Sequence, residues 1–193
     1  MKVASSPRLL ASLMCLMAFA APAAASNDAD VIKGVRTNAL YGGMPKQVAG
    51  FAMTESNSDP NRHTIRARYE HAEGDAAAVV NIRAVRAKGK VVELPDGPDS
   101  VAVGVNNVMK EYSSQSGASA ERVTVRETKG GDMNCVKVIR QEASMVRLVC
   151  RTAVHGRMIE SQSDARAGSG QADALALLET FTSELVAAVR QMP

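Results

Sequence analysis

Residues 132–155 of this 193-residue chain, DMNCVKVIRQEASMVRLVCRTAVH, decide the fold. They contain two segments rich in Val, Ile and other strand-forming residues, separated by the short polar stretch QEAS. A four-residue loop there pairs Arg140 with Met145, and the same register places Cys135 directly opposite Cys150. Opposed residues at a non-hydrogen-bonded position have Cα atoms about 4.5 Å apart, within the range for a disulfide. The stretch therefore predicts a β-hairpin closed by a Cys135–Cys150 disulfide.

A second turn, which contains Gly156, extends the hairpin by one strand. Glycine accepts the positive φ that a two-residue turn requires. The resulting register sets Arg151 opposite Glu160, and it also sets Arg147 opposite Asp164. Exposed cross-strand ion pairs contribute a few tenths of a kcal/mol to about 1 kcal/mol each. We expect both pairs to be scaffold, on the face of the sheet opposite the cysteines.

A strand at 121–129 precedes the hairpin, and the Gly-Gly pair that follows it favours a two-residue turn. That turn sets Val123 opposite Val138 and builds a second apolar patch on the face away from the cysteines. A bulged three-residue turn would instead shift the register by one residue and send Val123 and Val125 to the cysteine face. The favoured register predicts a sheet covered by helices on both faces.

The remaining apolar segments predict four further strands and two helices. Turn-forming residues bound the expected strands, which are 48–55, 64–71, 77–85 and 90–94. A helix capped by Asp99 or Ser100 follows them. Its apolar stripe consists of Val101, Val105, Val108, Met109 and Tyr112. A C-terminal helix at 171–191 closes the core with the stripe Leu175, Leu178, Phe181, Leu185 and Val189.

These elements predict an α+β fold, a single antiparallel β-sheet flanked by helices, with a cross-strand disulfide. Residues 48–193 form the single α+β domain. Residues 26–47 form either a flexible N-terminal extension or a short helix over 30–40.

The first 25 residues read as a cleaved signal peptide, with a basic start, an apolar run of about 13 residues and a small-residue cleavage site. The run is too short to span the roughly 30 Å core of a bilayer as a helix. Met14 is bulky where lipoprotein signals have a small residue, so we expect Cys15 to leave with the leader. The sequence thus predicts bacterial Sec-type export, a periplasmic or secreted location, and no transmembrane segment after cleavage.

Loss of the leader removes Lys2 and Arg8 but no acidic residue, which leaves 21 basic against 20 acidic residues and lowers the net charge from +3 to +1. The charge balance therefore gives no reason to expect a nucleic acid or an anionic membrane as partner. Basic residues do gather in the first strands: Arg62, Arg66, Arg68, Arg83, Arg86, Lys88 and Lys90. Few aromatic side chains accompany them, so stacking platforms for bases are scarce, and we interpret this group as a solvated edge.

The sequence predicts no catalytic residue, no cofactor and no metal site. None of the three histidines, His63, His71 and His155, stands at metal-ligand spacing with another His, Cys or carboxylate. Gly-x-Ser-x-Gly, phosphate-loop and dinucleotide motifs are absent from the sequence.

The expected function is an exported accessory or binding module. It would contact an envelope protein or a small ligand through the basic strands or through a cleft between helix and sheet. The alternative is a small secreted hydrolase, with one of the histidines in proton transfer, or an inhibitor of an envelope enzyme. Whether the protein is an enzyme stays open.

The order of elements resembles that of the Mog1/PsbP-like α/β/α domains. The likeness rests on the early strands, Pro95-Asp96-Gly97-Pro98 with a helix to Tyr112, the strands of 121–164, and the terminal helix around Leu178, Phe181 and Leu185. It implies an antiparallel sheet between helices and a role as accessory or binding module of exported proteins. It assigns no functional residue.

Overall fold

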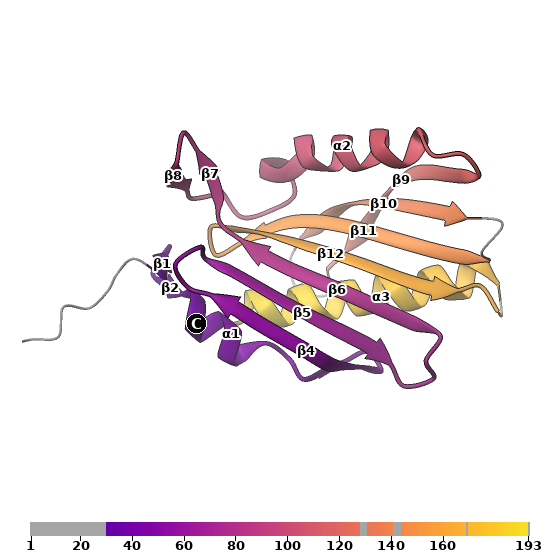
Figure 1. Ribbon diagram of the computed structural model, residues 1–193, viewed down its shortest axis with the longest axis horizontal. Helices are drawn as coiled ribbons and strands as arrows, with labels where there is room; N and C mark the ends of the chain where they lie inside the picture. The colour runs from indigo at the N-terminus through magenta and orange to yellow at the C-terminus, as the bar shows by residue number, and fades with distance from the viewer. Residues whose placement is uncertain (1–29, 128–130, 141–143, 169, 193) are drawn as a thin grey trace, which may run out of the picture.

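A computed structural model describes residues 30–127, 131–140, 144–168 and 170–192. Eight antiparallel strands form one curled sheet in the order β3-β4-β5-β6-β12-β11-β10-β9 (Figure 1). Its strands are β3 (Gln47–Val48), β4 (Phe51–Asp59), β5 (Thr64–His71), β6 (Ala76–Arg83), β9 (Ala118–Arg126), β10 (Asp132–Arg140), β11 (Met145–Val154) and β12 (Arg157–Arg166). The other elements are β1 (Val31–Ile32), β2 (Val35–Arg36), α1 (Thr37–Gly43), β7 (Val85–Ala87), β8 (Lys90–Val92), the 3-10 turn η2 (Asp99–Val101), α2 (Ala102–Ser113) and α3 (Gln171–Arg190).

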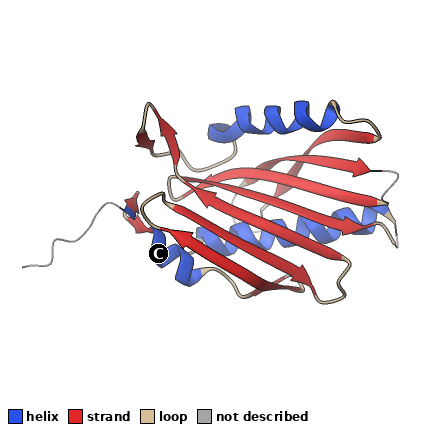
Figure 2. Cartoon of the chain, viewed as in Figure 1, coloured by secondary structure: helices blue, strands red, loops and turns tan. Residues whose placement is uncertain are grey.

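The predicted α+β class is wrong, because the protein is mostly β (Figure 2). Strands contain 49% of the described residues and helices 28%. Two strands extend beyond the bounds that the sequence pattern predicted. β4 continues beyond the predicted end at residue 55 through the polar segment 56–59, and β9 begins at Ala118, three residues before the predicted start. The long strands let the sheet curl into a half-barrel around α3, as the right-handed twist of adjacent strands favours.

The main core lies between the concave face of the sheet and α3. Phe181 of α3 packs against Phe51 and Tyr69, with ring centroids 4.4 Å and 5.4 Å away, and all three side chains are fully buried. Leu178 and Leu185 lie on the same stripe and are also fully buried. The helix predicted at the C-terminus is thus present, and its apolar stripe closes the core. Burial of each large side chain contributes about 1.5–3 kcal/mol.

A second, smaller core lies on the outer face, where α2 covers β9, β10 and β11. Val105, Val108 and Tyr112 of α2 pack there against Val136, Val138 and Val149 of the sheet. Neither Asp99 nor Ser100 caps α2 with its side chain. The Ser100 hydroxyl instead donates to the carbonyl of Pro95 at 2.8 Å, which closes the preceding turn.

The register predicted for β10 and β11 is confirmed. Arg140 lies opposite Met145 and Cys135 opposite Cys150. The cysteine sulfurs are bonded, with Cα atoms 4.0 Å apart. The predicted Cys135–Cys150 disulfide is therefore present, inside the main core.

The favoured register between β9 and β10 is wrong. The connection spans 127–131, because Arg126 lies opposite Asp132, and Val123 consequently faces Cys135. Both Val123 and Val125 therefore lie on the cysteine face, in the main core. Small residues of β9, Ala118 and Ala120, take their places beneath α2.

Residues 30–44 pack on the body of the protein. The helix expected at 30–40 is displaced to α1, because Lys33 and Gly34 have positive φ and turn β1 onto β2. Arg157 is fully buried and donates to the carbonyls of Ile32 (3.4 Å) and Val35 (2.9 Å) and to the hydroxyl of Thr37 (3.3 Å).

The predicted leader, residues 1–25 with Cys15, lies outside the described residues. In the described part of the chain, no helix has the length and apolarity needed to cross a membrane.

Candidate functional site

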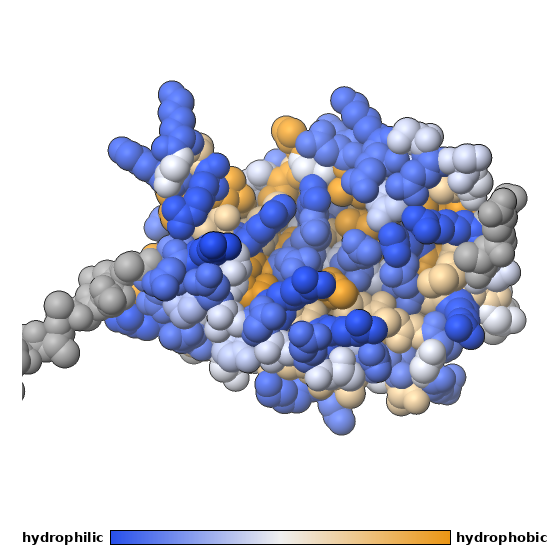
Figure 3. All heavy atoms as spheres, viewed as in Figure 1, coloured by the Kyte–Doolittle hydropathy of each residue, from blue (hydrophilic) through white to orange (hydrophobic). Residues whose placement is uncertain are grey.

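Half of the outer face of the sheet is left uncovered by α2. In β5, Ile65, Ala67 and Tyr69 point into the main core, so the residues between them point outward. We call the outward side chains of β4, β5, β6 and β12 the open face, and Figure 3 shows mostly hydrophilic residues across it. Its members are Glu55, Asn57, Thr64, Arg66, Arg68, Glu70, Ala77, Val79, Asn81, Arg83, Glu160, Gln162, Asp164 and Arg166.

Strand pairing arranges five polar residues in one row across the sheet. Asn57 lies opposite Arg66, and Arg66 lies opposite Asn81. Asn81 lies opposite Glu160, which in turn lies opposite Arg151. Neighbouring strands are about 4.8 Å apart, so the row spans about 19 Å. It joins the N-terminal strands to the C-terminal ones through the pairing of β6 with β12.

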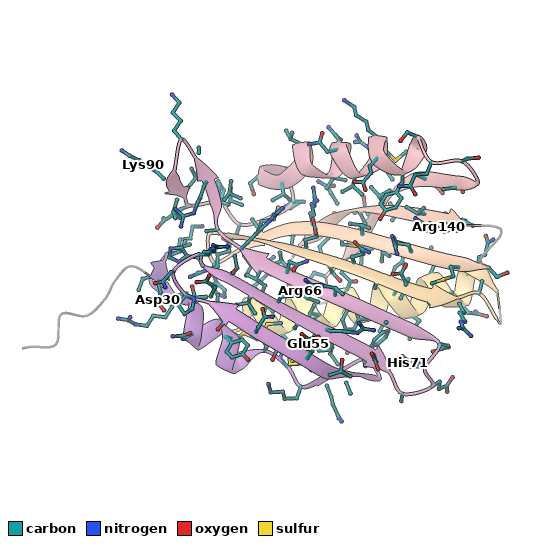
Figure 4. The ribbon with its side chains drawn as sticks, in the orientation of Figure 1. Asp30, Glu55, Arg66, His71, Lys90 and Arg140 are labelled. Atoms are coloured by element: carbon teal, nitrogen blue, oxygen red, sulfur yellow. A yellow bond between two sulfur atoms is a disulfide. The ribbon has the colours of Figure 1, made fainter. Side chains whose placement is uncertain are left out.

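Three exposed arginines of the open face, Arg66, Arg83 and Arg166, have no side-chain partner among the described residues, and the first two lie close together. Neither Arg66 nor Arg83 forms an ion pair or a side-chain hydrogen bond there, and both are exposed. Their neighbour Arg68, by contrast, is paired with Glu70 at 3.2 Å. A shallow depression of about 450 Å³ is lined by polar residues of four strands: Asn57, Thr64, Arg66, Asn81, Arg83 and Glu160. Figure 4 shows Arg66 and Glu55 on this side of the sheet, turned away from α3.

Arg147 marks the border between the open face and α2. Its Nε and Nη2 donate to the two oxygens of Asp164 at 2.6 Å and 3.0 Å, and its Nη1 donates to the Tyr112 hydroxyl of α2 at 2.8 Å. The hydrogen bond to Asp164 raises the pKa of Arg147 above its ordinary value. The predicted opposition of Arg147 and Asp164 is present, and it also anchors the end of α2 to the sheet.

Arg151 forms the second border pair, beneath the first turns of α2. Its Nε donates to Glu160 at 2.6 Å, as the predicted register requires. A Cβ atom on Gly104 of α2 would lie 2.5 Å from Nη1 of Arg151. Glycine at this position therefore gives the guanidinium its space. The sequence analysis did not use Gly104, although a glycine inside an apolar helix costs about 1 kcal/mol relative to alanine and can therefore indicate a close approach.

The histidines occupy three separate parts of the fold. His63 is buried with Nδ1 3.5 Å from the Thr37 hydroxyl, and burial together with the charge of Arg157 lowers its pKa. His155 has Nε2 3.1 Å from the Val189 carbonyl of α3. Neither ring belongs to the open face, and each is held by a contact within the core or at the end of α3.

His71 corrects one expectation, because it does stand at metal-ligand spacing. Ligand atoms of His71, Glu73 and Asp75 lie within 4.8 Å of one another at the turn between β5 and β6. The sequence analysis missed this set because it looked for known ligand spacings along the chain. The turn that contains Gly74 brings the three side chains together. A hydrogen bond of 2.8 Å between His71 Nδ1 and Asp75 Oδ1 is by itself enough to explain why these two residues lie close together. Within the described residues, the imidazole and carboxylate atoms of this set are close enough to bind one metal ion together.

The open face thus combines arginines that lack a partner among the described residues, amide side chains, and a border of paired arginines. We compared the chain with family models and with curated proteins. No family model and no curated protein matches the sequence, so the resemblance to Mog1/PsbP-like domains stays a prediction.

Proposed function

We propose that this protein is an exported binding module whose ligand or partner contacts the open face. One observation carries the proposal: Arg66 and Arg83 line the same depression, and neither has a side-chain partner within the part of the chain that the structure describes. Antiparallel sheets often leave one face in water, so an uncovered face alone would indicate little. Two uncompensated cations converging on one hollow are less easily explained as scaffold.

The other arginines support this reading by contrast. Most of them have a side-chain or carbonyl partner, for example Arg62 with Asp59, Arg126 with Asp132 and Arg140 with Gln115. Paired arginines contribute to register and packing, whereas an exposed, unpaired guanidinium is available to a ligand. The chain offers such groups on β5 and β6, in the basic strands where binding was expected.

Cross-links join the strands that border the open face. The Cys135–Cys150 disulfide links β10 to β11, and the border pairs of Arg147 and Arg151 tie β11 to β12. A preorganised surface loses little conformational entropy on binding. The disulfide also supports the proposed location, because such bonds persist in oxidising compartments such as the periplasm.

Site-specific photo-crosslinking in the exporting cell tests the proposal. A photoreactive amino acid would replace Val79 on the open face, Val103 on the exposed side of α2, or Ala176 on the exposed side of α3. We expect an adduct from position 79 that disappears when Arg66 and Arg83 are both changed to Gln. Thermal-shift measurements of the purified protein with a panel of small metabolites cover ligands that leave no protein adduct.

Two outcomes would overturn the proposal. Adducts from positions 103 or 176 with none from position 79 would place the contact surface elsewhere. A lack of both adducts and thermal shifts would leave the open face without a ligand.

A further inference from the structure

We infer that the depression around Arg66 and Arg83 binds a small molecule through an oxyanion, a carboxylate or a phosphate group. The inference rests on the proposed function, because it assigns a ligand chemistry to the same face. The volume of the depression, about 450 Å³, falls within the range of small-molecule sites, about 300–1,000 Å³.

The two guanidinium groups come from adjacent strands at diagonal positions. Arg66 of β5 lies opposite Asn81 of β6, and Arg83 of β6 lies opposite Thr64 of β5. Diagonal neighbours on one face of a sheet are about 7–8 Å apart at their backbones, within reach of long side chains. Both arginines can therefore approach one oxyanion from two sides.

The groups between them suit an oxygen-rich ligand. Asn57 and Asn81 flank Arg66 in the same row and offer amide donors, and the Thr64 hydroxyl offers a further hydrogen bond. The planar fork of arginine matches the two oxygens of a carboxylate or phosphate, with charge-assisted hydrogen bonds about twice as strong as neutral ones. Together they provide both charge and orientation.

The nearby acidic groups leave the depression with a positive excess. Glu160 lines it, but its charge is compensated by Arg151 through the 2.6 Å hydrogen bond. Glu55 lies one row away, opposite Arg68, and shares with Arg66 an adjoining small hollow of about 50 Å³, but it forms no ion pair with Arg66 and does not line the larger depression. Asp59 faces Arg62 at 3.5 Å. Arg66 and Arg83 thus remain the uncompensated charges of the larger depression.

A small anion fits better than a nucleic acid strand. Single-stranded nucleic acids bind through aromatic side chains on which bases stack. None of the open-face residues named above is aromatic, and the ring at its border, Tyr112, is engaged by Arg147.

The test is a titration of the full mature protein, followed by amide chemical shifts, with inorganic phosphate and with citrate at low ionic strength. We expect saturable shifts at residues 57, 64, 66, 81 and 83 with at least one of the two anions. R66Q/R83Q should weaken binding by about tenfold or more, since each arginine supplies charge-assisted hydrogen bonds. R66K keeps the charge but loses the fork, and should weaken it by a smaller factor.

R126Q is the matched control, because Arg126 is exposed and lies on β9, away from the open face. It removes one positive charge and should change the dissociation constant less than twofold. A response to phosphate alone would identify a phosphate ester as the ligand class, and a response to citrate alone would identify a carboxylate. Melting temperatures of all variants confirm that they are folded.

Two results would overturn the inference. One is the lack of shifts at these residues with both anions, and the other is a double variant that binds as well as the wild type. If position 79 still crosslinks to a partner in either case, the proposed function stands and only the ligand chemistry is wrong.

Discussion

The two halves of the outer face use arginine in opposite ways. Beneath α2, Arg147 and Arg151 are largely buried and each is bonded to a carboxylate of β12. On β5 and β6, Arg66 and Arg83 are exposed and have no such partner among the described residues. The same residue type at the same outward positions is scaffold in one half and a candidate contact in the other. What distinguishes the halves is the helix above them and the residue across the strand.

Arg157 is a fully buried arginine, and its replacement should have the largest effect on stability. R157M should lower the free energy of unfolding by about 3–5 kcal/mol, because the carbonyls of Ile32 and Val35 would lose their donors inside the protein. Urea unfolding with the disulfide intact measures this. R66M removes an exposed arginine and should change stability by less than about 0.5 kcal/mol. Equal effects of the two substitutions would abolish the distinction between buried and exposed arginines.

Arg147 should give an intermediate effect. D164A leaves a largely buried guanidinium without its carboxylate and should cost about 2 kcal/mol, and R147L should cost a similar amount. A double-mutant cycle in chemical denaturation should then give a coupling energy of about 1–2 kcal/mol. The same cycle on Arg68 and Glu70, an exposed pair, should give less than about 0.5 kcal/mol. A coupling energy near zero for Arg147 and Asp164 would show that this pair is no stronger than a surface pair.

Gly104 tests whether α2 needs space for Arg151. Glycine to alanine within a helix normally stabilises by up to about 1 kcal/mol. G104A should instead destabilise by about 1 kcal/mol, because the new Cβ would push Arg151 away from Glu160. In the background R151A/E160A the same substitution should stabilise. Thermal unfolding of the wild type, G104A, R151A/E160A and the triple variant measures both effects. A stabilising G104A in the wild-type background would contradict the close approach.

His63 should give the smallest effect, a dependence of stability on pH. Its folded-state pKa lies below 6.5 because of burial and the charge of Arg157. The unfolded state therefore binds the proton more readily, so stability is retained above about pH 6.5 and falls as the pH drops below it. H63N suits the positive φ at this position and should flatten the curve between pH 7 and pH 5. An unchanged slope in H63N would assign the pH dependence to other groups.

The sequence predicted the parts of the sheet that short turns determine. The registers of β10 with β11 and of β11 with β12 follow from turn chemistry, and with them the disulfide. The same reasoning failed between β9 and β10, because Gly130 and Gly131 suggested a two-residue turn where the connection is longer. It also predicted β4 too short, because the residues at its C-terminal end, 56–59, are polar and give no apolar signal.

The open face could not be derived from the sequence because it depends on a long-range pairing. β6 and β12 are adjacent in the sheet although about eighty residues separate them, as the opposition of Val79 and Gln162 shows. No turn connects these strands, so only the three-dimensional structure brings Asn81 beside Glu160. The arginines of β5 and β6 were recognised as a basic group, but their lack of partners was visible only once their neighbours were known.

The buried position of the disulfide makes its reduction depend on opening of the main core. Both sulfur-bearing residues are at most 2% exposed, in the core that α3 closes. A water-borne thiol can attack only after the C-terminal helix has lifted or the neighbouring strands have parted. The rate at which a mild reductant cleaves the disulfide of the folded protein will therefore report how often this part of the core opens.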